Sequence, residues 1–187
     1  MIYHAATPAT HTYTLRKGII KLTKHWPMAA PRLCAILCAG DLFGFDGFAD
    51  EPYNHTAVAL AAVEVCRLPL TELVMLKEQH IEVDNALTVR WIQHLREAED
   101  MMLELGAKRA PERLASFLIR WYRRNDEAWV LLPLSRAEIG ELLGLTIETV
   151  SRFLSEWKRR GLLDEQRKQI RILDCKALQE LACQECV

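Results

Sequence analysis

The chain has 187 residues, of which 26% are charged and 50% hydrophobic, with a formal net charge of −1, a composition typical of a folded protein of one or two domains. This composition excludes an intrinsically disordered chain. No apolar run approaches the roughly 18–20 residues that a membrane-spanning helix needs. Because the N-terminus lacks the basic start and apolar core of an export signal, we expect a cytoplasmic protein whose six cysteines are reduced thiols. Residues 107–187 hold 15 Lys and Arg against 12 Asp and Glu, which makes this half the place to look for an anionic partner.

Up to about residue 70 the chain reads as short strands between turn residues, which predicts a small antiparallel β domain. Turn residues at Lys17-Gly18 and at Gly40-Asp41 separate the apolar stretches. The strand patterns lie at 13–16, 19–22, 33–37 and 57–68. From about residue 70 onward the hydrophobic period becomes helical.

The longest helical pattern runs over 84–105 and predicts a dimerisation helix, with Gly106 as its stop. Its apolar residues follow one another at spacings of 4, 4, 3, 4 and 3, as in the seam of a coiled coil. A helix that packs on its own domain would show the same periodicity. Since the seam contains no charged residue, we expect dimerisation without an effector. The predicted interface residues are Leu87, Trp91, Leu95, Ala98, Met102 and Leu105.

The most specific pattern lies at 134–152 and predicts two short helices joined by a tight turn. Ser135 with Glu138 three residues later is a capping box, Gly144 ends the first helix, and Thr146 caps the second, with Thr149 in its first turn. Two short helices across a turn that contains glycine form a helix-turn-helix. In such a unit the second helix enters the major groove of DNA.

Helical geometry places Glu148, Ser151 and Arg152 together on the exposed face of this second helix. Arg bonds bidentately to guanine, Glu accepts from the cytosine amino group, and Ser can bond to either partner of a base pair. Lys158 and Arg159 near the helix end suit phosphates better than bases. The alternative is an ordinary helical hairpin with a solvated charged face. The predicted DNA-binding residues are Glu148, Ser151, Arg152, Thr146, Thr149, Ser135, Lys158 and Arg159.

A β-hairpin directly after this helix predicts a winged helix. Gly161 is followed by a polar turn at 164–168 and by a strand in which Ile170 and Ile172 alternate with polar residues. The basic side chains of this segment either touch the adjacent DNA backbone or are simply solvated.

On these residues the chain resembles the Crp/Fnr superfamily of bacterial transcription regulators, and the Fnr branch in particular, from roughly Thr12 to Leu181. The sequence Gly40-Asp41-Leu42-Phe43-Gly44-Phe45 resembles a turn of the family's sensor roll. The resemblance implies a β-roll, a long dimer helix and a winged helix, in homodimers that bind palindromic promoter sites and touch RNA polymerase. It also implies that Glu148, Ser151 and Arg152 read a TTGAT-type half-site.

Three departures from the family pattern limit what carries over. The match begins inside the roll, which predicts either a truncated start or a shortened sensor with an exposed sheet edge. Cys66 matches the later cysteine of the Fnr iron–sulfur site, but the three closely spaced N-terminal cysteines are absent, which argues against such a cluster. Residues 54–57 replace the Arg-Ser pair of the cyclic-nucleotide sensors and offer no guanidinium to an anion, which argues against cyclic AMP.

The remaining cysteines are interpreted from their spacing and position alone, without the family resemblance. Cys34 and Cys38, four apart on a predicted strand, are read as small core residues. The terminal cysteines are read as incidental thiols, so the sequence predicts no metal site and leaves the cofactor unknown. The alternative is a redox or metal-sensing cluster, for which the candidates are Cys66, Cys175, Cys183 and Cys186.

Together these features predict an α+β protein with a partial antiparallel β-roll at 1–79, a dimerisation helix at 80–106 and a winged helix-turn-helix domain at 107–187. We expect a homodimeric, sequence-specific transcription regulator that binds double-stranded DNA and no membrane. One alternative is a regulator of the same fold gated by redox change, haem or nitric oxide. Another is a small β-barrel enzyme, which the absence of a His-x-His pair or a catalytic dyad disfavours, so no enzymatic activity is predicted.

Overall fold

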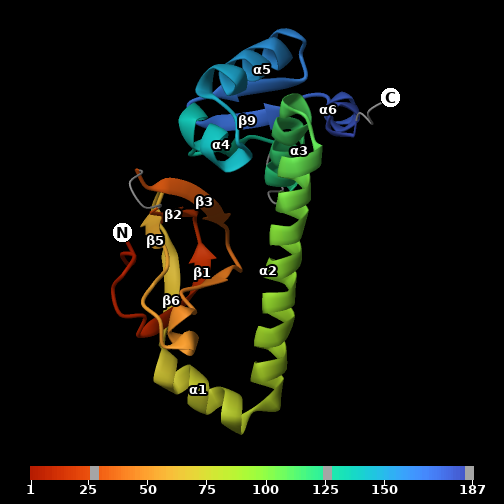
Figure 1. Ribbon diagram of the computed structural model, residues 1–187. Helices are drawn as coiled ribbons and strands as arrows, with labels where there is room; N and C mark the ends of the chain where they lie inside the picture. The colour runs from red at the N-terminus through yellow and green to blue at the C-terminus, as the bar shows by residue number, and fades with distance from the viewer. Residues whose placement is uncertain (26–29, 124–127, 184–187) are drawn as a thin grey trace. The chain divides into compact units, whose positions relative to one another are not determined.

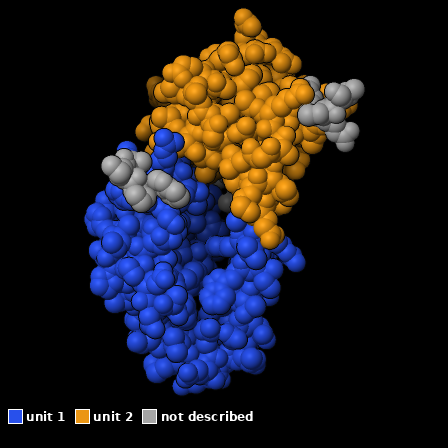
Figure 2. Space-filling view, in the orientation of Figure 1, with its two compact units in different colours: residues 1–98 blue, residues 99–187 orange. Residues whose placement is uncertain are grey.

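The computed structural model describes residues 1–25, 30–123 and 128–183, and the chain divides into two compact units, residues 1–98 and 99–187 (Figure 2). The first unit holds two antiparallel sheets, and the second holds a helix-turn-helix with a small antiparallel sheet. The predicted α+β fold is therefore confirmed.

The strands of the first unit form two three-stranded sheets, ordered β4-β1-β6 and β3-β2-β5 (Figure 1). The predicted strand at 57–68 is in fact two strands, and the first two strands of the chain join different sheets. Gly18 allows this passage because it lies at φ +93°, where a Cβ would stand 2.6 Å from the Ala62 carbonyl oxygen. The strand bounds are β1 His11–Lys17, β2 Ile20–Lys24, β3 Arg32–Leu37, β4 Leu42–Phe43, β5 Thr56–Ala59 and β6 Glu64–Pro69.

The interior of this roll is filled by aromatic rings and aliphatic side chains. Tyr3 stacks on Tyr53 with ring centroids 3.9 Å apart, and Tyr13 stacks on Phe43 at 5.2 Å. The first residues of the chain also pair with β5, since the Ala57 N–H donates to the Tyr3 carbonyl. This backbone bridge gives β5, an edge strand of its sheet, a second partner besides β2 at that point.

The prediction that Cys34 belongs to the core was wrong, because Cys34 is exposed on β3. Side chains alternate between the two faces of a strand, and Leu33 and Leu37 occupy the inward positions of β3. Cys38 lies just beyond the end of the strand and is half-buried. The two thiols therefore do not form the shared core face that the sequence suggested.

Two helices, α1 (Leu70–Gln79) and α2 (Ile81–Ala107), follow the roll (Figure 1). At the N-terminal end of α2, Leu87 is buried and the Trp91 ring meets Phe45 and Phe48 edge-on, with centroids 5.9 Å apart in both pairs. Phe48 belongs to the short 3-10 helix η1 (Asp46–Ala49). This part of α2 therefore packs on its own unit. Packing of this kind was the alternative to dimerisation that the periodicity of the seam left open.

Gly106 does not end α2, which continues to Ala107. The Lys108 N–H still donates to the Glu104 carbonyl, so the helical hydrogen-bond pattern passes across the glycine. A left-handed residue stops a helix, but Gly106 is not among the residues with positive φ. It is therefore a residue of the last turn.

The second unit continues with helices and strands in the order of a winged helix-turn-helix. Its three-stranded antiparallel sheet has the order β7-β9-β8. Buried side chains from α3 to α6 form its core, among them Leu118, Ile139, Leu154 and Leu178. The bounds are α3 Ala110–Arg123, β7 Val130–Leu131, α4 Arg136–Leu143, α5 Ile147–Arg159, β8 Leu163–Gln166, β9 Gln169–Ile172 and α6 Cys175–Ala182.

Candidate nucleic-acid interface

Local hydrogen bonds fix the start of α4. Ser135 lies in an extended conformation before the helix, and its hydroxyl accepts from the Glu138 N–H at 3.2 Å. The Glu138 carboxylate in turn accepts from the Ser135 N–H at 2.8 Å. This reciprocal pair is the predicted capping box, and it satisfies two donors that a helix start leaves open.

The turn between α4 and α5 depends on two glycines. Gly144 adopts the left-handed conformation (φ 63°, ψ 40°) and its N–H donates to the Gly140 carbonyl, which ends α4 as predicted. The sequence reading missed Gly140, where a Cβ would lie 2.5 Å from the Leu145 carbonyl oxygen. The chain can therefore pass this close to α4 only because Gly140 has no side chain.

Helix α5 buries one face and exposes the other. Val150, Leu154 and Trp157 are almost completely buried against the rest of the second unit. Glu148 and Arg152 are exposed and Ser151 is partly exposed. Since residues at i, i+3 and i+4 are neighbours on a helix surface, these three polar side chains form one outward patch.

The first turn of α5 keeps Glu148 ionised. The Thr146 hydroxyl caps the helix by accepting from the Thr149 N–H at 3.2 Å. Hydrogen bonds from the backbone N–H of Glu148 itself and from the Thr146 side chain lower the pKa of the Glu148 carboxyl. The Arg152 guanidinium lies over the neighbouring Phe153 ring, 5.1 Å from its centroid. The patch thus presents a carboxylate acceptor and a guanidinium donor side by side.

The two basic residues predicted to touch phosphates differ in their surroundings. Lys158 forms an ion pair with Asp164 of β8, with Nζ 2.7 Å from Oδ1, and it also donates to the Glu165 carbonyl at 3.2 Å. Arg159 is exposed. A second ion pair joins the Arg136 guanidinium of α4 to the Glu165 carboxylate at 2.6 Å. No pattern in the sequence indicated these contacts, which join both helices to the hairpin of β8 and β9.

The wing is tighter than the sequence suggested. Strands β8 and β9 pair from Leu163–Ile172 to Gln166–Gln169, so the predicted polar turn shrinks to Arg167 and Lys168. Both residues have positive φ, 45° and 66°, as the two central residues of a type I′ hairpin turn do. Two basic side chains therefore stand at the tip of the hairpin.

Comparison with known proteins agrees with this geometry. Residues 112–181 match the Crp-like helix-turn-helix domain, and residues 1–80 match the cyclic nucleotide-binding domain. The transcriptional activator protein anr of Pseudomonas aeruginosa is 31% identical over 186 residues, which cover 97% of this chain and 76% of that protein. FnrA of Stutzerimonas stutzeri is 34% identical over 175 residues, 91% of this chain and 72% of that protein. The chain belongs to the Crp/Fnr family of transcription regulators.

A solved structure of the same family supports the assignment. The structure of FixK2 from Bradyrhizobium japonicum matches with a TM-score of 0.88 and 32% identity, over 99% of this chain and 93% of that one. The relatives named here are transcription regulators, and the helix-turn-helix is the DNA-binding element of this Crp/Fnr protein. Among residues 1–25, 30–123 and 128–183, no helix is long and apolar enough to cross a membrane.

The seam residues of this Crp/Fnr chain fall into two groups. Leu87 is buried and Trp91 is 38% exposed against the aromatic rings of its own unit. Further along α2 the seam opens to solvent, and Leu95 and Met102 are 60% and 67% exposed. Ala98 and Leu105 are also exposed. The open part of the seam is therefore a row of exposed apolar side chains along α2.

The cysteine candidates do not come together. Cys66 is exposed on β6, whereas Cys175 and Cys183 are exposed at the two ends of α6. Cys186 lies outside the described residues. Within the part of the chain that the structure describes, no group of three or more Cys, His, Asp or Glu side chains could hold a metal ion.

In residues 54–57, which replace the Arg-Ser pair of the cyclic-nucleotide sensors, the titratable residue is His55. His55 is half-buried, and burial lowers the pKa of its imidazole. Its neighbours Asn54 and Thr56 are uncharged. Two charged side chains of opposite sign, Lys24 and Asp46, also act on this imidazole.

Proposed function

We propose that the chain is a homodimeric regulator that reads a palindromic promoter site with TTGAT-type half-sites. The observation that carries the proposal is the patch of Glu148, Ser151 and Arg152 on the outward face of α5, whose opposite face is buried. These side chains can read a guanine, a cytosine amino group and a neighbouring base edge. Thr146, Thr149 and Ser135 lie at the ends of the same two helices and suit backbone contacts.

Dimerisation is proposed through the exposed half of the α2 seam, centred on Leu95, Ala98 and Met102. A helix that exposes apolar residues at spacings of three and four gains free energy by packing against a second copy of itself. Residues 80–106 would then act as a dimerisation segment between the β-roll (1–79) and the DNA-binding domain (107–187). A dimer in turn would present two copies of α5 to successive major grooves.

The remaining parts of the proposal follow from the function. We propose contact with RNA polymerase and a cytoplasmic location for this chain by its resemblance to the family. We propose no enzymatic activity for it. The seam contains Ala98 at its centre and no carboxylate, which supports dimerisation in the absence of an effector.

The proposal is tested by footprinting the full chain on a duplex that contains TTGAT-N4-ATCAA, with and without oxygen. A duplex of the same composition with scrambled half-sites is the control. We expect protection of both half-sites and at least about a thousandfold preference over the control, the lower end for specific DNA-binding proteins. Equal binding to the two duplexes would contradict the proposal. A footprint that changes with oxygen would favour the redox-gated alternative.

A further inference from the structure

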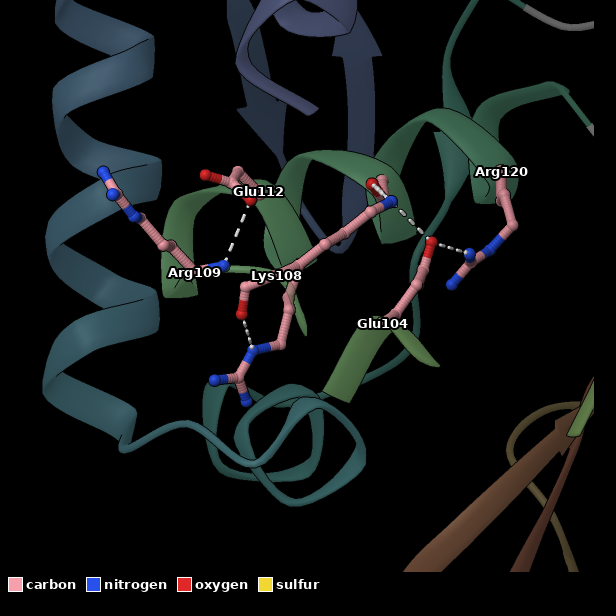
Figure 3. Close-up of polar contacts among 7 residues, drawn as sticks. Glu104, Lys108, Arg109, Glu112 and Arg120 are labelled. Atoms are coloured by element: carbon pink, nitrogen blue, oxygen red, sulfur yellow. Dashed lines mark hydrogen bonds and ion pairs between the residues drawn. The ribbon is translucent and has the colours of Figure 1, made fainter. Parts of the chain in front are cut away.

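The connection between α2 and α3, residues 108 and 109, is held by side chains rather than left open. The Lys108 ammonium donates to Glu104 Oε1 and to the Ser116 hydroxyl, each at 2.8 Å, and the Arg120 guanidinium donates to the same Glu104 oxygen at 2.6 Å (Figure 3). Glu104 is only 13% exposed. One carboxylate on the last turns of α2 is thus clamped by two cations, one of them on α3.

The electrostatics show that this clamp favours the ionised carboxylate. Burial alone would raise the pKa of Glu104, but the hydrogen bonds from Arg120 and Lys108 outweigh it and lower the pKa below its usual value. On the other side of the connection, the buried Glu112 carboxylate accepts from the Arg109 N–H at 3.1 Å (Figure 3). The backbone between the two helices is therefore fixed from both sides.

Arg113 extends this network to the helix-turn-helix. Its Nε atom donates to the Lys108 carbonyl at 3.0 Å, and its Nη1 atom donates to the Leu143 carbonyl at 2.9 Å. Leu143 is the last residue of α4, next to the Gly144 turn. One planar guanidinium thus bonds the end of α2 and the turn before α5 at the same time.

Packing at Gly144 shows how close these segments are. A Cβ on Gly144 would lie 3.3 Å from Arg113 Nη1 and 3.8 Å from Leu105 Cδ2. Leu105 belongs to the last turns of α2, in the same compact unit as α4 and α5. Leu105, near the end of α2, therefore lies beside the turn that joins α4 to α5.

We propose that Arg113 is a positioning residue for DNA recognition, which fixes the helix-turn-helix on the end of α2 so that the dimer presents its two α5 helices at one set spacing. The inference rests on the proposed function, because it requires a dimer on a palindromic site. Arg113 does not touch the base edges in this scheme. Its effect is on the distance between half-sites that the dimer accepts.

The first experiment measures spacer preference with the full chain. Binding of wild type, Arg113→Gln and Arg109→Gln is compared on TTGAT-N4-ATCAA, on duplexes with spacers of three, five and six base pairs, and on a duplex with a single half-site. Arg109 is the matched control, because it carries the same charge one turn away with an exposed side chain. We expect Arg113→Gln to lose about tenfold of the preference for the N4 spacer, a typical coupling between two sites, with half-site affinity nearly unchanged. Arg109→Gln should keep the preference.

The binding results test the positioning role of Arg113 separately from the proposed function. Full spacer preference in Arg113→Gln, or an equal loss on half-site and palindrome, would overturn the positioning role. A wild type that does not prefer the palindrome over scrambled DNA would contradict the proposed function instead.

A second measurement uses the wild-type protein alone, without DNA and without any substitution. In the wild-type protein, hydrogen exchange is followed at the amides of Lys108, Arg113 and Leu145, which bond to Glu104, Arg109 and Gly140. If the three segments form one body, these amides open together with similar protection. Fast exchange at Lys108 and Arg113 beside a protected Leu145 would show a free hinge and refute the inference.

Discussion

The Nζ atom of Lys158 lies 2.7 Å from Oδ1 of Asp164 and thereby joins the last turn of α5 to the first strand of the wing. A lysine engaged in this way is already partly neutralised within the protein. Arg159, the next residue along, is exposed. The two cations at the end of α5 therefore differ in how freely they can reach a DNA phosphate, although they are neighbours in the sequence.

This difference predicts that Arg159 and Lys158 contribute unequally to the salt dependence of DNA binding. Replacement of Arg159 by Ala should reduce the slope of log K against log salt by about 0.9, the value for one phosphate contact. Lys158→Ala should change the slope less, because its ammonium is shared with Asp164. Binding to the TTGAT palindrome at several salt concentrations measures both slopes. An equal or larger change for Lys158→Ala would show that the ion pair opens on DNA.

The same ion pair makes stability depend on pH in acid. Hydrogen bonds from Lys158 and from the Glu165 N–H lower the pKa of Asp164 below its usual value of 3.8. A carboxyl with a lower pKa in the folded state stabilises the fold above its unfolded pKa, and this contribution disappears as the pH falls through the folded pKa. Thermal melting of wild type and Asp164→Asn between pH 7 and pH 2 tests this. The two proteins should differ most near neutral pH and converge as the pH falls through the lowered pKa of Asp164, and a difference that grows in acid would contradict the assignment.

Arg152 should govern specificity rather than overall affinity. Its guanidinium is exposed on the outward face of α5, where a bidentate contact to guanine is worth about 1–3 kcal/mol against a wrong base. Arg152→Ala should therefore lose about that much on the TTGAT palindrome and relax the preference at one base pair of each half-site. Competition among duplexes with single base changes gives the readout. A uniform loss on every sequence would mark Arg152 as a backbone contact.

Two glycines in helices should respond to alanine with opposite signs. Gly140→Ala places a methyl group 2.5 Å from the Leu145 carbonyl, and overpacking of this kind costs about 1–3 kcal/mol. Gly106 lies inside α2 and no atom approaches its Cβ position within 4 Å, so Gly106→Ala should stabilise the protein by about 0.5–1 kcal/mol. Denaturant unfolding of the two variants provides the comparison. Destabilisation by both would mean that Gly106 has a partner in the dimer.

The sequence predicted those parts of the site that depend on short-range signals. Ser135 with Glu138, and Thr146 before α5, lie within one turn of the groups they cap, so their spacing alone was sufficient. Lys158 with Asp164 and Arg113 with Leu143 are contacts between elements, and a single sequence gives no register for such pairs. The outward orientation of the Cys34 side chain could not be predicted either. Side chains alternate along a strand, but this alternation alone does not say which of the two sets faces the core.

The register of the α2 seam gives a final prediction. Leu95 and Met102 are seven residues apart and therefore on one face of the helix, and both are more than half exposed. Val89 is 54% exposed, but its helical position points away from that face, which makes it a matched control. Leu95→Glu or Met102→Glu would bury a carboxylate in the proposed dimer, so we expect at least a hundredfold weaker dimerisation, about 2.7 kcal/mol or more.

Sedimentation at micromolar concentration measures this effect, with Val89→Glu expected to remain a dimer like the wild type. Because a monomer holds only one α5, the two seam variants should also lose cooperative binding to the palindrome while they retain binding to a single half-site. A wild-type monomer in plain buffer would instead show that dimerisation needs an effector. Loss of the dimer in Val89→Glu alone would place the interface on the opposite face of α2 and overturn the seam assigned here.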